Sequence, residues 1–229
     1  MMHTIDADAT GGSNARFTVR HRNVVPPDVM QIFGLPVTSL ARTLVDVASS
    51  CSFLVAVTMI DHALRVERER VASDAERGLV GAAVLSKEDL HVELAAVHPR
   101  FGVKRATHAI EFANPLAANP GETLGRVRMR ELGFEVPELQ VYFRVDGLDH
   151  WVDYFWRGVR KIGEFDGNHK YTRGIVLGNR DPADVVIAEK KREDRLRTRV
   201  NSFIRWDWDT AYSQRLFYAF LDEHGVPRT

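Results

Sequence analysis

The sequence has very little cysteine, no dominant charge and no long apolar run. Its single cysteine, Cys51, cannot form an internal disulfide, and nothing around it points to a catalytic thiol. No segment approaches the roughly 20 apolar residues that a membrane helix needs, so no membrane partner is expected. The 31 basic residues balance the 31 acidic ones, so any contact with nucleic acid must come from a local basic patch. These absences predict a cytoplasmic protein.

The first half of the chain carries mostly helical patterns. Residues 1–15 are polar and predict a flexible tail, and residues 16–25 alternate apolar and basic side chains as an exposed strand does. Residues 36–70 have helical periodicity, with Thr38 and Ser39 as candidate caps. Further helices are expected after the capping-box sequence at residues 86–89 and over residues 104–113. We therefore expect a mainly helical region over residues 16–115, ending at the proline-containing stretch ANPLAANPG.

The second half of the chain changes pattern and predicts an α/β domain over residues 116–229. A helix closed by Gly133 is followed by three strands in hairpin connection, a long charged helix, a strand and a closing helix. The expected ranges are 122–132 for the first helix, then 139–145, 151–156 and 159–165 for the strands, then 182–200, 203–208 and 211–224. This order predicts a central mixed sheet flanked by helices.

Three acidic residues lie near the ends of two of these strands. Asp153 begins one apolar run, and Glu164 and Asp166 end the next. If the two strands pair, these carboxylates converge, and Mg²⁺ or Mn²⁺ prefers carboxylate oxygens together with several waters. Asp and Gly are also ordinary turn residues, so a solvated hairpin end with no metal is the alternative.

The order of elements and these acids resembles the PD-(D/E)XK nuclease superfamily. More closely, residues 119–224 are similar to a nuclease-like domain of unknown function related to very-short-patch-repair mismatch endonucleases. That resemblance rests on an acid in the first helix, an acid on the second strand, an acid-x-Asp-Gly followed by His, an acid-x-x-Arg helix and a final strand. Those positions are Glu122, Asp153, Glu164, Asp166, Gly167, His169, Glu189, Arg192, Leu196 and Phe203-Ile204-Arg205. The resemblance implies a restriction-endonuclease-like fold.

The first half of the chain has a resemblance of its own. The words TVRHRNVVPPDV and GLPVTSLARTLVDVA are similar to the stretch that precedes the nuclease-like domain in many actinobacterial AbiEi-type antitoxin-like proteins. In those proteins a winged helix-turn-helix commonly comes first, and we expect it to be missing here. Arg42, Thr43 and Asp46 form a candidate signature in this stretch. Local capping and pairing on one helix is the interpretation that we favour for them.

The nuclease resemblance implies a mechanism. Asp153 and Glu164 would hold Mg²⁺, Asp166 would complete or orient the shell, and Glu122 would reach the ion through a water. Glu122 can equally serve only to complement the helix dipole. Full family motifs carry a lysine two residues after the second acid, where this chain has Asp166. Lys161 lies on the same strand, but its odd-numbered spacing from Glu164 puts it on the opposite face. Lys190 or Lys191 could project from the long helix instead. We prefer His169, whose ordinary pKa is near neutrality, as general acid or base, with a surface imidazole as the alternative.

Two basic segments flank the proposed site and predict contacts with phosphates. The candidate nucleic-acid-binding residues are Arg126, Lys190, Lys191, Arg192 and Arg195. Acids interleave with these cations, so a solvated helix laced with ion pairs is the alternative. Tryptophans such as Trp151 could stack on bases, although strand tryptophans more often pack in a core or at its rim.

Together these features predict a metal-dependent endonuclease that hydrolyses DNA phosphodiester bonds. RNA is the alternative substrate, and a homodimer is an open alternative for the assembly. The other class of function is a non-catalytic nucleic-acid-binding regulator, or an antitoxin-like protein, on a nuclease fold. That alternative follows from the missing lysine, because a fold alone does not guarantee activity.

Overall fold

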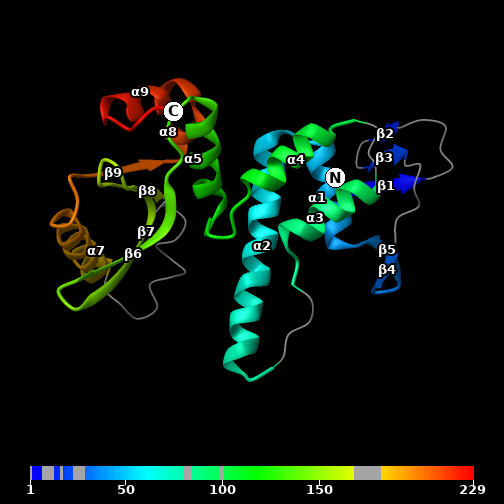
Figure 1. The fold of residues 1–229 in the computed structure, drawn as a ribbon, viewed down its shortest axis with the longest axis horizontal. Coiled ribbons are helices and arrows are strands. Elements are labelled where there is room, and N and C mark those ends of the chain that lie inside the picture. The colour runs from blue at the N-terminus through cyan, green and yellow to red at the C-terminus, as the bar shows by residue number, and fades with distance from the viewer. Residues whose placement is uncertain are drawn as a thin grey trace. The chain divides into compact units, whose positions relative to one another are not determined.

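The computed structural model describes residues 2–6, 13–15, 18–22, 29–79, 84–97, 101–167 and 182–229. The chain forms two compact units, Met1–Ala113 and Asn114–Thr229 (Figure 1). The division falls inside the proline-containing stretch, two residues before the boundary expected between residues 115 and 116. His169 lies outside the described residues.

Unit 1 begins with short strands. Strands β1 (Met2–Asp6), β3 (Thr18–Arg22) and β2 (Ser13–Ala15) form a three-stranded sheet in the order β1-β3-β2. The expected strand in residues 16–25 is therefore present. Residues 2–6 and 13–15, which we expected to belong to a flexible tail, also form strands. Both segments pair with β3, because an exposed strand offers unpaired backbone groups along its two edges.

Unit 1 also contains a hairpin formed by β4 (Val29–Ile32) and β5 (Leu35–Thr38), which the sequence patterns did not predict. Its turn places Phe33 and Gly34 at positive φ, the geometry of the tight turns that join twisted strands. The two strands are short, and β5 contains Pro36, so their pattern resembles a loop more than a strand.

The rest of unit 1 is helical, as expected. Its helices are α1 (Leu40–Ser50), α2 (Phe53–Glu76), α3 (Lys87–Val97) and α4 (Val103–Phe112). Ser39 caps α1 by accepting a hydrogen bond from the Arg42 N–H, and Ser86 and Asp89 form the capping box of α3. The helices bury a shared apolar core that includes Val45, Ala48, Val57, Ile60, Leu90, Ala109 and Ile110.

The candidate signature on α1 engages in local contacts. The guanidinium Nε of Arg42 donates to Asp46 Oδ2 at 3.1 Å, and the Thr43 hydroxyl donates to the Ser39 carbonyl at 2.9 Å. Both contacts join residues one turn apart on the same helix. The favoured interpretation of local capping and pairing is therefore confirmed.

Unit 2 is an α/β domain built on one mixed sheet. Its helices are α5 (Pro120–Glu131), α7 (Pro182–Arg197), α8 (Trp208–Tyr212) and α9 (Gln214–Glu223). Its strands are β6 (Glu138–Val145), β7 (Leu148–Trp156), β8 (Lys161–Asp166) and β9 (Ser202–Asp207). The sheet order is β6-β7-β8-β9, antiparallel except for the parallel pair β8 and β9. The expected central mixed sheet is confirmed.

Helices cover both faces of this sheet (Figure 1). On one face Leu196 of α7 packs in a buried cluster with Val152, Phe155, Ile162 and Phe203. On the other face α5 approaches the sheet so closely that Gly121 lies against the Phe165 ring, and Gly125 lies against Tyr154 and Trp206. The expected closing helix is divided into α8 and α9 at Ser213, whose hydroxyl caps α9. The sheet is thus packed between α7 on one face and α5 on the other, and these helices hold the ends of β7 and β8 in place.

None of the described helices combines the length and the apolar character needed to cross a bilayer. Even α2, with 24 residues, carries charged residues along its length.

Gly163 on β8 tests how tightly the α5 face is packed. A Cβ there would lie 2.9 Å from the Trp156 ring and 2.9 Å from the Trp206 ring, and both rings are buried. We expect Gly163→Ala to lower the free energy of unfolding by about 1–3 kcal/mol through overpacking. Urea unfolding followed by circular dichroism measures this. The control is Gly158→Ala, because a Cβ at Gly158 meets open space; equal midpoints for the two variants would contradict the prediction.

Candidate functional site

The candidate site lies where the two central strands of unit 2 stop pairing. The β7–β8 ladder ends at Tyr154 and Gly163, so Asp153 and Glu164 occupy the next opposite positions. There the Asp153 carboxylate accepts a hydrogen bond from the Phe165 N–H, with 2.9 Å between Oδ2 and N. A side chain thus takes a donor that the ladder would otherwise use. This bond brings the first two predicted acids to one place on the sheet.

The neighbouring strand β6 is distorted at the same level. Gln140 lies opposite Asp153 by the register of β6 and β7, yet the two residues on either side pair and it does not. Its φ of 49° falls in the left-handed region, which residues other than glycine adopt rarely. Such a conformation persists only where its surroundings enforce it, and it is common at functional sites. Here it turns the Gln140 amide toward Glu122, with Nε2 3.4 Å from Oε2.

Glu122 reaches this place from the start of α5. The side chain of Asn119 caps the helix, Pro120 occupies its first position, and Glu122 follows at the third. Its two oxygens accept hydrogen bonds from the Asn119 side-chain amide at 2.7 Å and from the Ala118 N–H at 2.8 Å. Glu122 is therefore part of the helix start, and it is also only 2% exposed. Burial distinguishes it from an acid that merely complements a helix dipole.

Glu122 and Asp153 are electrostatically coupled carboxyl groups. Burial, together with the charge of Asp153, raises the pKa of Glu122 from 4.5 to about 7. Burial likewise raises the pKa of Asp153 from 3.8 to about 6; the charge of Glu164 adds to this rise, and the Phe165 hydrogen bond opposes it. Asp153 is thus the middle member of a chain of three acids. Titratable groups whose pKa values are shifted in this way are frequent at catalytic and binding sites.

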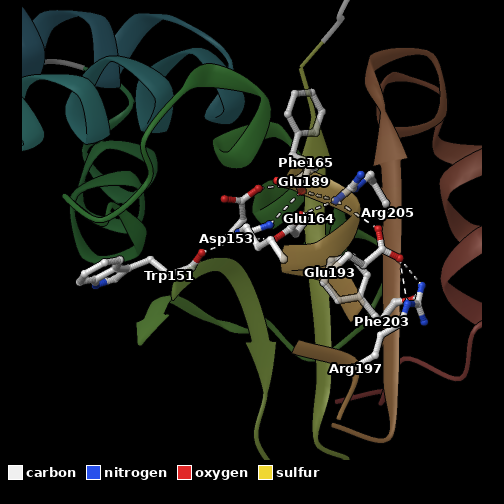
Figure 2. A network of polar contacts seen from close by, with 10 residues as sticks. Trp151, Asp153, Glu164, Phe165, Glu189, Glu193, Arg197, Phe203 and Arg205 are labelled. Atoms are coloured by element: carbon white, nitrogen blue, oxygen red, sulfur yellow. Dashed lines mark hydrogen bonds and ion pairs between the residues drawn. The ribbon is translucent and has the colours of Figure 1, made fainter. Parts of the chain in front are cut away.

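Glu164 differs from the other two because arginines neutralise it. Its Oε1 accepts a hydrogen bond from Arg192 Nη2 at 2.6 Å, and its Oε2 accepts one from Arg205 Nη2 at 2.8 Å (Figure 2). Arg205 lies directly opposite Glu164 on β9, and Arg192 comes from α7. Glu164 is 7% exposed, and a buried carboxylate needs such partners. We call Arg192 and Arg205 the arginine clamp.

Two acids of α7 hold the arginine clamp from the other side. Glu189 Oε1 accepts hydrogen bonds from Arg192 Nη1 at 3.0 Å and from Arg205 Nη2 at 2.9 Å. Glu193 lies 3.5 Å from Arg205 and also pairs with Arg197. The interleaved acids of the long helix are therefore partners of this network, as the ion-pair alternative predicted for this part of α7.

Asp166, a predicted catalytic residue, and Lys161, which the alternation of strand side chains excluded, occupy different positions on β8. Asp166 is half-buried at the end of β8, opposite Asp207 of β9. Lys161 lies at the far end of the same strand, where its Nζ contacts the Ser202 hydroxyl and the His224 carbonyl. Within the described ranges, no three or more His, Cys, Asp or Glu side chains are arranged to hold a metal ion. The structure thus groups Glu122 with Asp153 and Glu164, and places Asp166 two residues beyond Glu164, at the end of the same strand.

The predicted phosphate-binding residues divide into two groups. Arg126 is only 2% exposed, and its charge lowers the pKa of Glu122, so it is placed to balance the buried acids and is not presented to a surface phosphate. Arg192 belongs to the arginine clamp. Lys190 and Lys191 are exposed on α7, and half-buried Arg195 lies 4.0 Å from Asp146. These last three residues form the accessible cationic face of α7.

Sequence reasoning missed Gln140 as a member of the site. Nothing in the local sequence marks it, because its role follows from a backbone distortion and from the strand opposite. Arg205 was one of the positions that carry the nuclease resemblance, but no role was predicted for its side chain. Its partnership with Glu164 depends on the parallel pairing of β8 and β9, which residue spacing alone does not specify.

Comparison of the chain with protein-family models, with curated proteins and with solved structures finds no match. The resemblance to nucleases therefore rests on the motif residues themselves.

The two raised pKa values predict how stability depends on pH without divalent metal. A carboxyl group whose pKa is higher in the folded state stabilises the fold while it is protonated, and this contribution is lost as the pH rises through the folded value. For Glu122 the window runs from pH 4.5 to about 7. We expect the free energy of unfolding of wild type to fall across this window by on the order of 2–3 kcal/mol more than that of Glu122→Gln.

Urea unfolding at a series of pH values, in the presence of a chelator, measures this difference. The control is Glu131→Gln, which removes an exposed carboxylate from the same helix. That control should keep the wild-type pH dependence. Parallel curves for wild type and Glu122→Gln would show that Glu122 is ionised in the folded protein throughout.

Proposed function

We propose that this protein is a divalent-metal-dependent nuclease that hydrolyses DNA phosphodiester bonds. The observation that carries the proposal is the coupled group of Glu122, Asp153 and Glu164 from α5, β7 and β8. Two of the three have raised pKa values because burial and mutual repulsion disfavour their charged forms. A fold has little to gain from such a group unless a cation balances it.

The donor chemistry of these residues suits Mg²⁺ or Mn²⁺. Both ions prefer carboxylate oxygens, and a site made from two or three acids leaves positions for water and for a phosphate oxygen. Asp153, with Glu122 and Glu164 beside it, would hold the ion. Bound there, the ion would polarise the phosphate and lower the pKa of a water molecule. Asp166, two residues beyond Glu164, supplies a further carboxylate at the same end of β8.

The cations of unit 2 suit a polyanionic substrate. Lys190, Lys191 and Arg195 line the accessible face of α7, where they can neutralise phosphates on either side of the bond that is cut. The arginine clamp is adjacent to the acids and can stabilise charge on the phosphate itself. His169 remains our prediction for the general acid or base, and a homodimer likewise remains a prediction. Cys51 carries a free thiol, which suits the cytoplasm that we propose as its compartment.

A second candidate function is binding of nucleic acid without cleavage. The observation that favours it is that both Glu164 oxygens already accept hydrogen bonds from arginines. A carboxylate engaged in this way is a poor metal ligand until one arginine leaves it. The protein would then act as a regulator that uses the cationic face of α7.

Cleavage assays decide between these functions. We expect plasmid DNA to be cut in Mg²⁺ or Mn²⁺, and Asp153→Asn to lower the rate at least about 100-fold, because a metal ion supplies several kcal/mol of transition-state stabilisation. Asparagine keeps an oxygen that can accept the Phe165 N–H bond, so the fold should survive. Glu122→Gln and Asp166→Asn test the other acids, and single-stranded DNA and RNA are assayed alongside.

Asp194→Asn, which changes an exposed acid of α7, should leave the rate unchanged. If Asp153→Asn cut DNA at the wild-type rate, the group of Glu122, Asp153 and Glu164 would not be the catalytic site. Absence of cutting on all substrates, with DNA binding intact, would favour the regulatory function.

Metal binding has a consequence for stability that does not require activity. We expect Mg²⁺ at ten times its dissociation constant to raise the free energy of unfolding of wild type by about 1.4 kcal/mol. Asp153→Asn should abolish this increase. Thermal unfolding with and without Mg²⁺ measures it, and an equal gain in both proteins would place the ion elsewhere.

A further inference from the structure

We infer that Tyr142 and Trp151 form a stacking site for an unpaired nucleobase next to the acid group. The two residues lie directly opposite each other on β6 and β7, and their ring centroids are 5.3 Å apart. Trp151 is 54% exposed and Tyr142 is 47% exposed. This inference rests on the proposed function and specifies its substrate as nucleic acid with an accessible base.

The exposure of Trp151 sets it apart from Trp156 and Trp206, the two other tryptophans of the same sheet. Trp156 and Trp206 are buried, and they stack on Tyr154 under α5. Trp151 instead points away from the charged network that its own backbone joins (Figure 2). A large apolar ring held at the surface is available to a ligand that offers a flat apolar face, and every base offers one.

Polar contacts hold both members of this aromatic pair in place. The Tyr142 hydroxyl donates a hydrogen bond to Asp149 Oδ1 at 2.7 Å. The Trp151 carbonyl accepts one from Arg192 Nη2 at 2.9 Å, and the same nitrogen binds Glu164. The Tyr142 ring and the Trp151 backbone are therefore fixed before a base arrives, which leaves less of the site to be ordered on binding.

The position of the pair relative to the acids suits one strand of nucleic acid. Trp151 precedes Asp153 by two residues on the same strand, a separation of about 7 Å. A nucleotide advances by about 3.4 Å along the axis of a duplex, and by more in an unstacked strand, so a base near Trp151 would lie no more than about two nucleotides from a phosphate at Asp153. On this side of the hairpin Arg144, which is exposed on β6, lies 3.8 Å from Asp149, and Arg195 of α7 lies 4.0 Å from Asp146, so each of these arginines faces an acid.

Stacking of this kind selects for unpaired bases. The faces of bases inside a duplex are covered by their neighbours, whereas a single strand, a bulge or a flipped base exposes them. The simpler alternative is that the aromatic pair only stabilises the hairpin through cross-strand packing. These two roles differ in what happens when the indole is removed.

The test measures how the protein binds a single-stranded oligonucleotide and the corresponding duplex in the presence of a chelator. Binding is monitored by the tryptophan fluorescence of the protein and by the fluorescence anisotropy of the oligonucleotide. We expect the single strand to quench the fluorescence of wild type. Trp151→Leu should weaken single-strand binding about 5- to 150-fold, because stacking on one aromatic side chain contributes that factor. Duplex binding should change less than about twofold, since it depends on the phosphate contacts of α7.

Two further variants separate stacking from hairpin stability. Trp151→Phe keeps an aromatic face and should recover most of the single-strand affinity, whereas Tyr212→Leu removes an exposed aromatic residue elsewhere in unit 2 and should change neither affinity. Equal losses for single strand and duplex in Trp151→Leu, or no loss for either, would overturn the inference.

Plasmid cleavage in Mg²⁺, measured on the same preparations, keeps the two proposals distinguishable. A wild-type protein that cuts DNA but shows no single-strand preference retains the proposed function without the stacking site. Failure of wild type to bind either oligonucleotide overturns the stacking site, and cleavage then decides the proposed function independently.

Discussion

The candidate site depends on one hydrogen bond, from the Phe165 N–H to the Asp153 carboxylate. Because a side chain takes this donor, the β7–β8 ladder ends and the half-buried Asp153 carboxylate is held at the junction of two strands. That placement brings Asp153 close to Glu122 on one side and to Glu164 on the other. The coupling among the three acids, and the raised pKa of two of them, follows from this single position.

Charge in unit 2 is arranged so that two acids are left partly unbalanced while the third is fully engaged. Arg192 and Arg205 neutralise Glu164, and Glu189 in turn neutralises the arginines. Glu122 has mainly neutral hydrogen-bond partners in Asn119, Ala118 and Gln140. In a buried environment, neutral donors compensate an ionised carboxylate less well than a guanidinium does. This difference in compensation is the basis on which we propose a cation at Glu122 and Asp153. Glu164 would have to exchange an arginine partner before it could bind the same ion.

Much of unit 2 could be predicted from local patterns. The strand alternation and the helix signals at Asn119, Pro120 and Gly133 place the elements within a few residues, because such signals act over one or two turns. In unit 1, by contrast, the hairpin β4–β5 was missed because its strands are short and β5 contains Pro36. The burial of Arg126 was also missed, since a basic helix face looks the same in sequence whether it meets solvent or buried acids.

The sequence by itself determined which acids these are, Asp153 and Glu164, and roughly where along the paired strands they lie, because residue order along two joined strands limits where they can meet. Only the tertiary structure decided that Glu122 and Gln140 join them, that the arginine clamp engages Glu164, and that Trp151 is exposed while Trp206 is buried. The reason is physical: pairing between distant segments sets burial and partner choice. Those two properties control the pKa of a carboxyl group and the accessibility of a ring.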